Sequence, residues 1–85
     1  TDKNLENFKK KILYKATNRG WKETDILLGE FTKKNIESFS IDELKMLDNL
    51  LDEADAEIFE WVTNKKNPPK IFDNKIMRML KQYAE

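Results

Sequence analysis

The segment from Arg19 to Asp25, which reads RGWKETD, carries the residue types best suited to binding chemistry in this 85-residue chain. The chain has two arginines against fourteen lysines, and only the guanidinium of arginine offers a planar fork that binds a carboxylate with two parallel hydrogen bonds. Gly20 has no side chain, so another backbone can approach it closely. Trp21 has the large amphipathic ring that is enriched at the centres of protein interfaces. These residues indicate a turn that binds another protein.

A purely structural interpretation of the same segment is also open. Gly20 would end the preceding helix in the left-handed C′ position, and Trp21 would fold into the core. Glu23 and Asp25 would then only complement the dipole in the first turn of the next helix. Residue types alone favour this structural interpretation.

Catalytic and metal-binding chemistry finds little support elsewhere in the chain. With no His and no Cys, the sequence excludes an imidazole base, a His–carboxylate metal site, a thiol nucleophile, a zinc ribbon and a disulfide. The acidic stretch from Asp52 to Glu60 lacks the spacing and the central Gly of a calcium-binding loop, and Asp55 is expected to cap a helix instead. Gly20 and Gly29 are isolated, so no phosphate-binding loop is predicted. We expect no catalytic residue and no metal site.

Charge is unevenly distributed along a chain whose net charge is zero. Residues 1–36 carry a net charge of +4, residues 37–64 carry −8, and residues 65–85 carry +4. Lys9–Lys11 and Lys33–Lys34 could contact phosphates, but the acidic middle third would repel a duplex, so nucleic acid is not expected as a partner. The basic and acidic blocks are expected to neutralise one another on solvated helix faces.

Hydrophobic spacing predicts helices along almost the whole chain and no strands. The first helix stops at residues 17–20, and the second begins near Lys22. The apolar positions that mark these two helices are Leu5, Phe8, Ile12, Ala16, Ile26, Leu27, Leu28, Phe31 and Ile36. Gly29 within the second helix costs about 1 kcal/mol relative to Ala, which indicates a close helix contact or a surface that a partner approaches.

Three further helices complete the prediction. A capping box at Ser40 and Glu43 starts the third helix, and Asp55 can cap a short fourth. Pro68-Pro69 must lie in a loop before a last helix over about residues 73–83. The apolar positions of these helices are Leu44, Leu47, Leu50, Leu51, Ile58, Phe59, Trp61, Val62, Ile76, Met77, Met79, Leu80 and Tyr83. We therefore predict a single domain over residues 1–85, an all-α compact bundle of five short helices that does not insert into a membrane.

The motif Arg19-Gly20-x-x-Glu23 resembles the RGxxE signature of the succinate dehydrogenase flavinylation factors of the SdhE type. Further matching features follow in order over about residues 8–84: Leu13-Tyr14, Phe31, Leu50-Leu51, Asp55 before the helix with Phe59 and Trp61, and Pro68-Pro69 before the last helix. Members of this family are five-helix bundles, in agreement with the helix prediction. Many of them have a basic residue directly before the arginine, where this chain has Asn18.

The resemblance implies an assembly factor and not an enzyme. Such factors bind the flavoprotein subunit of succinate dehydrogenase, and in some bacteria that of fumarate reductase. They promote covalent attachment of FAD to a histidine of this client, so FAD is carried by the client and the factor has no cofactor of its own. By analogy, the client-contacting surface consists of Arg19, Gly20 and Glu23, with Asp25, Tyr14 and Trp21 beside them.

Further expectations follow from the same resemblance. Arg19→Ala or Gly20→Arg is expected to abolish flavinylation of the client while leaving the helical fold and its melting near normal. A monomer that forms a one-to-one complex with the client is expected in a bacterial cytoplasm, since no targeting segment is visible; a trimmed protein of the mitochondrial matrix is not excluded. The alternative function is an antitoxin-like regulatory adaptor for a membrane-associated partner.

Overall fold

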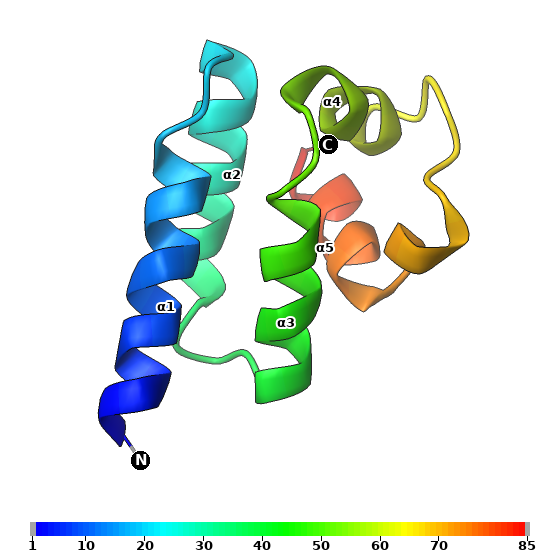
Figure 1. The fold of residues 1–85 in the computed structure, drawn as a ribbon. Coiled ribbons are helices and arrows are strands. Elements are labelled where there is room, and N and C mark those ends of the chain that lie inside the picture. The colour runs from blue at the N-terminus through cyan, green and yellow to red at the C-terminus, as the bar shows by residue number, and fades with distance from the viewer. Residues whose placement is uncertain (1, 85) are drawn as a thin grey trace.

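The computed structural model describes residues 2–84, and within that range it contains five α-helices, one turn of 3-10 helix and no strand. The elements are α1 (Asp2–Thr17), α2 (Lys22–Asn35), α3 (Ile41–Leu50), α4 (Asp55–Val62), η1 (Lys70–Phe72) and α5 (Lys75–Ala84). Figure 1 shows α1 and α2 as an antiparallel pair, with α3 beside them and α4 and α5 on the other side of the molecule. α1 packs against α2 and α3, and α5 packs against α2, α3 and α4. The prediction of an all-α bundle of five helices is confirmed.

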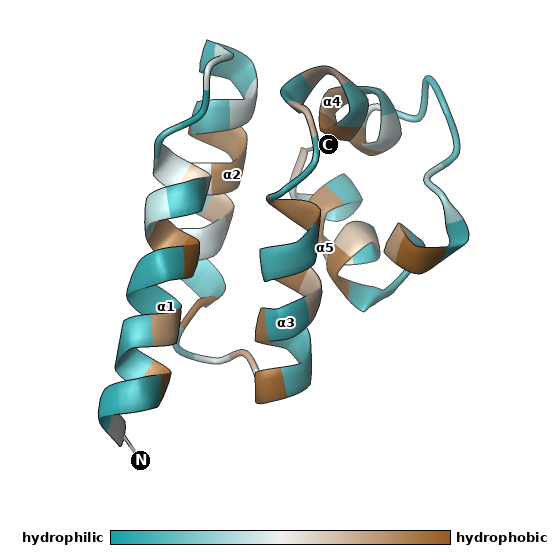
Figure 2. Cartoon of the chain, viewed as in Figure 1, coloured by the Kyte–Doolittle hydropathy of each residue, from teal (hydrophilic) through white to brown (hydrophobic). Residues whose placement is uncertain are grey.

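A single hydrophobic core joins the five helices. Figure 2 shows hydrophobic bands that alternate with hydrophilic ones along each helix, as expected when each helix buries one face. The core residues without exposed surface are Ile12, Ala16, Leu28, Leu44, Leu47, Ile58, Ile76 and Leu80. These include predicted positions from every helix, so the helical spacing of apolar residues correctly identified the centre of the core.

The buried face of α2 differs in part from the predicted one, which includes the buried residues Leu28 and Phe31. Thr24, Leu28, Phe31 and Thr32 are buried, whereas Ile26 is 48% exposed. α2 lies between α1, α4 and α5, and the packing of these helices turns the two threonines inward. Threonine is a polar residue type, but its methyl group can pack in a core. Spacing alone therefore identified Leu28, Phe31 and Ile36 correctly, misplaced Ile26 and missed the two threonines.

Gly29 lies where α2 passes the C-terminal end of α1. A Cβ atom at this position would lie 3.3 Å from Thr17 Cγ2 and 3.7 Å from the Ala16 carbonyl oxygen. Of the two interpretations of Gly29, the close helix contact is the one that the structure confirms.

The ends of α1 and α2 are organised without a left-handed glycine. No glycine among residues 2–84 has a positive φ, so the prediction that Gly20 occupies the left-handed C′ position is wrong. The last carbonyls of α1 instead accept bonds from side chains: Thr17 Oγ1 donates to Leu13 O, and Asn18 Nδ2 donates to Tyr14 O, each at 2.8 Å. Because side chains satisfy these carbonyls, the helix ends without the backbone turn that needs glycine.

The predicted cap of α3 is confirmed, whereas the predicted cap of α4 is wrong. The Ser40 hydroxyl accepts from Glu43 N–H at 3.2 Å, and the Glu43 carboxylate accepts from Ser40 N–H at 2.8 Å, so the predicted capping box is present. The N-cap of α4, however, is Ala54, which makes no side-chain bond. Asp55 is the first residue of the helix, and its carboxylate is engaged elsewhere.

Candidate functional site

Arg19 points into the molecule, and only 9% of its side chain is exposed. Its Nε donates to Asp55 Oδ1 at 2.5 Å, while its two terminal nitrogens donate to the carbonyl oxygens of Leu51 and Glu53, each at 2.6 Å. The guanidinium thus reaches from the turn between α1 and α2 to the turn between α3 and α4. The carboxylate that this arginine binds belongs to its own chain.

The second carboxylate oxygen of Asp55 binds the backbone of the α1–α2 turn. Oδ2 accepts from Gly20 N–H at 3.1 Å and from Trp21 N–H at 3.2 Å. The buried hydroxyl of Thr24 has a single proton and lies between the Trp21 carbonyl, at 3.2 Å, and this carboxylate. Asp55 therefore joins α4 to the turn through both of its oxygens, which explains why it does not cap α4.

The ionisation of Asp55 follows from these contacts. Burial alone would raise the pKa of this carboxyl group, but Arg19, the nearby Thr24 hydroxyl and the Trp21 N–H outweigh burial and hold its pKa below the ordinary value of 3.8. At neutral pH, Asp55 is a carboxylate and forms a largely buried ion pair with Arg19.

The remaining predicted site residues divide into two groups. Asp25 is half-buried, and its carboxylate accepts from Arg19 N–H at 3.3 Å, so it supports the turn from within, as Arg19 does. Tyr14, Gly20, Trp21 and Glu23 lie on the outside, with Tyr14 68% exposed. The structure thus brings all six residues to one end of the α1–α2 pair but turns two of them inward.

Trp21 is 45% exposed, so the structural interpretation that placed it in the core is wrong. One side of its ring packs against Phe59 of α4 with ring centroids 6.2 Å apart. Lys65 Nζ lies 5.7 Å from the centroid of the Phe59 ring. Trp21 therefore lies on α4 while leaving nearly half of its surface to solvent.

A row of ion pairs runs along the contact between α1 and the acidic middle of the chain. The pairs are Lys11–Asp48, Lys15–Asp48, Lys15–Asp52 and Arg19–Asp55, with N···O distances of 3.6, 2.7, 2.6 and 2.5 Å. Lys11 and Lys15 lie four positions apart on α1 and so share one face of that helix, and Arg19 extends the row from the turn after it. Burial lowers the pKa of Lys15, but the carboxylates of Asp48 and Asp52 outweigh it and raise that pKa above 10.5. The expected neutralisation of the charge blocks within the fold is confirmed along this row.

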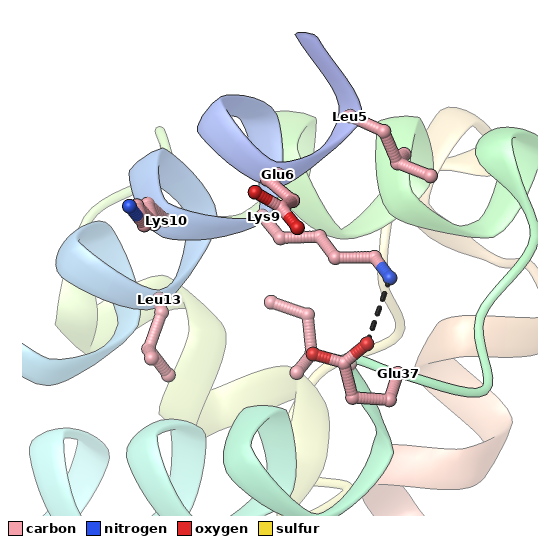
Figure 3. Close-up of a pocket in the computed structure, with 7 residues that line it drawn as sticks. Leu5, Glu6, Lys9, Lys10, Leu13 and Glu37 are labelled. Carbon is pink, nitrogen blue, oxygen red and sulfur yellow. Dashed lines mark hydrogen bonds and ion pairs between the residues drawn. The ribbon is translucent and has the colours of Figure 1, made fainter. Parts of the chain in front are cut away.

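A hollow of about 490 Å³ lies along α1 and just after the end of α2, and none of the predicted site residues lines it. Its lining residues are Leu5, Glu6, Lys9, Lys10, Leu13, Ile36 and Glu37. Figure 3 shows the ion pair between Lys9 and Glu37, 2.9 Å long, that spans it. Within residues 2–84, no group of acidic side chains is arranged to hold a metal ion. No described helix is long and apolar enough to cross a membrane.

Comparison with known proteins gives a consistent result. Residues 10–84 match the family model described as the flavinator of succinate dehydrogenase. The protein named succinate dehydrogenase assembly factor 2-A, mitochondrial, of Drosophila ananassae is 38% identical over 86 residues, which cover 99% of this chain and 55% of that protein. The protein named succinate dehydrogenase assembly factor 2, mitochondrial, of Dictyostelium discoideum is 31% identical over 81 residues, covering 95% of this chain and 57% of that protein. This chain thus spans about half the length of these relatives, and the matches do not favour a regulatory adaptor.

These matches correct the expected cell compartment. The relatives are named as mitochondrial proteins, so the expectation of a bacterial cytoplasm is wrong. That expectation rested on the lack of a visible targeting segment in 85 residues. Such an observation says nothing about the compartment of a chain that spans about half of its relatives' length.

Proposed function

The chain belongs to the family of flavinators of succinate dehydrogenase, and from this premise we propose that it binds the flavoprotein subunit of that enzyme and promotes covalent attachment of FAD to it. It acts by binding and not by catalysis. The FAD and the histidine that receives it belong to the client, and the factor holds the client in a conformation that aligns the two groups. In this proposal, residues 1–85 act as one unit, and one monomer binds one client in the mitochondrion. The flavoprotein subunit of fumarate reductase is a second client to test.

The client-binding surface that we propose is the outer side of the α1–α2 turn. Gly20, Trp21 and Glu23 are exposed there, Tyr14 is exposed near the end of α1, and the half-exposed indole of Trp21 has the character of an interface anchor. Arg19 lies beneath this surface, where it holds Asp55. Its part in client binding is therefore indirect, in contrast to the contact that the sequence motif suggested.

The observation that carries this assignment is the missing side chain at Gly20. Its φ is not positive, so its backbone conformation does not require glycine. A Cβ atom would meet Asp55 Oδ2 at 3.6 Å, which is an ordinary contact. Neither conformation nor packing within this chain explains the missing side chain. We propose that close approach of another molecule explains it, since a partner backbone can come closer to glycine than to any other residue.

Substitution of Gly20 tests the proposal. Gly20→Ala is expected to keep the melting temperature and most of the client flavinylation, because the added methyl group fits against Asp55. Gly20→Arg is expected to keep the helical fold and to lower flavinylation at least tenfold, because its side chain would occupy the space of the client. In-gel flavin fluorescence of the client measures the product, and circular dichroism measures the fold.

Asn49→Arg supplies the control, because Asn49 is an exposed residue of α3 outside the proposed surface. It adds the same side chain and should leave client fluorescence unchanged. Undiminished fluorescence with Gly20→Arg would show that the client does not bind this turn. Equal losses with both arginine variants would indicate a general effect of added charge and would also contradict the assignment.

A further inference from the structure

We infer that Asp55 is a positioning residue, which holds the α1–α2 turn from α4 in the conformation that binds the client. The inference rests on the proposed function and deepens it, because it assigns a role to a residue outside the RGxxE motif. Asp55 lies 35 positions from Gly20 in the sequence and accepts hydrogen bonds from three consecutive residues of the turn, Arg19, Gly20 and Trp21.

The backbone of the turn depends on carboxylates for its hydrogen bonds. Between the end of α1 at Thr17 and the start of α2 at Lys22, the N–H groups of Gly20 and Trp21 both donate to Asp55, and that of Arg19 donates to Asp25. The first backbone bond of α2 appears only at Asp25 N–H, which donates to Trp21 O at 2.9 Å. The conformation of residues 19–21 is thus held by side chains, and two of its three N–H groups are held by a residue of another helix.

The start of α4 shows what this arrangement replaces. An aspartate beside a helix start usually accepts from the helix's own N–H groups, which stabilises the helix. Here Ala54 is the N-cap and makes no side-chain bond, while both oxygens of Asp55 face the turn. The carboxylate therefore accepts hydrogen bonds from the turn in place of the N–H groups at the start of its own helix.

The chemistry of the carboxylate is specific to this task. One oxygen accepts from Arg19 Nε and the other accepts from Gly20 and Trp21, so both oxygens act as acceptors at the same time. An asparagine of the same shape offers one acceptor oxygen and one NH₂ donor. Whichever way its amide is oriented, an NH₂ group faces either Arg19 or the two backbone N–H groups. The low pKa of Asp55 agrees with a site built for the ionised form.

Hydrogen exchange in the free protein tests the positioning role without the client. In Asp55→Asn, hydrogen exchange measured by NMR is expected to speed up at least tenfold more at the amides of Gly20 and Trp21 than at amides in the middle of α1 and α3. Glu57→Gln is the matched control, because Glu57 is an exposed acidic residue of the same helix. It should change neither set of rates. Unchanged exchange at Gly20 and Trp21 in Asp55→Asn would overturn the inference.

Client binding tests whether the conformation that Asp55 holds is the one that binds the client. Asp55→Asn is expected to raise the Kd for the flavoprotein subunit about tenfold, and saturating amounts of the variant should restore full flavinylation. A loss that saturation does not restore, or faster exchange with unchanged Kd, would overturn the inference. Failure of the proposed function is seen separately, since Gly20→Arg would then leave flavinylation intact whatever Asp55→Asn does to exchange.

Asp55→Glu guards against an effect on folding alone. This variant keeps the charge and both acceptor oxygens but adds one methylene group, so exchange at Gly20 and Trp21 and the Kd should fall between those of the native protein and Asp55→Asn. If Asp55 only stabilised the fold, both variants would lower the melting temperature and speed exchange in all helices together, with no preference for residues 20 and 21. That pattern would count against a positioning role.

Discussion

Arg19 holds three acceptors at once, and each of its three nitrogens makes one of these bonds. Two of the acceptors are backbone carbonyls at the end of α3 and in the following turn, where the helix leaves carbonyls without partners. A lysine could not replace this arrangement, because its ammonium group lacks the planar fork that reaches three acceptors in fixed directions. The role of Arg19 is to join two turns, and the residues that it supports face the solvent.

The stability of an Arg19→Ala variant tests this role. Removal of one partner from a largely buried ion pair leaves Asp55 without its counter-charge and two carbonyls unbonded, and it should lower the free energy of unfolding by about 3 kcal/mol. For a domain of this size, the melting temperature should fall by roughly 10 °C or more. This replaces the expectation that Arg19→Ala leaves melting near normal. Urea unfolding followed by circular dichroism measures the change.

Arg78→Ala provides the comparison, because Arg78 is the second arginine of the chain and is exposed on α5. Its stability should stay within about 0.5 kcal/mol of the native value. If both variants were equally stable, the bonds of Arg19 would contribute little and this interpretation of Arg19 would be wrong. A loss of flavinylation in Arg19→Ala should therefore be read only alongside its folded fraction.

At the scale of the helices, close contacts and helix ends decide the arrangement. α1 and α2 approach each other at Gly29, where an added Cβ atom would lie 3.3 Å from Thr17 Cγ2, which is a tight contact. Thr17 uses its hydroxyl at the same time to bond the Leu13 carbonyl, so one residue both ends α1 and packs against α2. This contact holds the α1–α2 pair together just below the turn that carries the proposed surface.

A double substitution separates the two effects at Gly29. Glycine in a helix interior costs about 1 kcal/mol relative to alanine, whereas a Cβ atom here would press on Thr17 Cγ2. Thr17→Ser removes that methyl group and keeps the hydroxyl. Gly29→Ala is therefore expected to raise the free energy of unfolding of the Thr17→Ser protein by about 0.5–1 kcal/mol. In the native background it should raise this free energy by less, or lower it. Thermal unfolding of the four proteins measures this coupling, and equal effects in both backgrounds would contradict the contact.

At the scale of the whole molecule, opposite charges on different helices pair with one another. α1 meets the acidic residues of α3 and of the turn after it, and Lys75 of α5 lies 2.6 Å from Glu43 Oε2 at the start of α3. The net charge of zero thus reflects contacts that close the bundle as well as solvated faces. Two carboxylates in these contacts have lowered pKa values, and this makes the stability of the bundle depend on acid pH.

Acid unfolding tests this dependence. Hydrogen bonds from Lys75 and from the Ser40 N–H lower the pKa of Glu43 below 4.5, and the contacts described above lower that of Asp55 below 3.8. A lowered pKa means that the native state binds fewer protons than the unfolded chain, so the stabilisation is complete above these values and is lost as the pH falls below them. The free energy of unfolding should be nearly flat from about pH 7 to 5 and should decrease below about pH 4.5.

Asp55→Asn isolates one contribution to this acid limb. The variant should be less stable at pH 7 but should lose less stability between about pH 4 and 2, because the titrating carboxylate is absent. Urea titrations at several pH values measure both the stability at pH 7 and its loss in acid. Parallel curves for the native protein and the variant would show that Asp55 does not contribute a lowered pKa to folding.

Local features of the molecule were determined by the sequence alone. The five helices, the capping box at Ser40 and Glu43, the loop at Pro68-Pro69 and the leucine stripe of α3 were all predicted and confirmed. Each depends on residues within about four positions of one another, and helical spacing and helix ends involve only such neighbours. The motif that indicated the family is also a local pattern.

The directions of the side chains at the site were decided by the tertiary structure. Arg19 and Asp55 are 36 positions apart, and nothing between them in the sequence specifies that they meet. An arginine or an aspartate beside a helix end is compatible with solvent, with a helix cap or with a buried pair, and residue type does not choose among these. The same holds for Ile26, exposed on α2, and for Thr24, buried on it. Only the packing of α2 against α1 and α4 fixes which groups lose water, and a charged group that loses water must find its partner there.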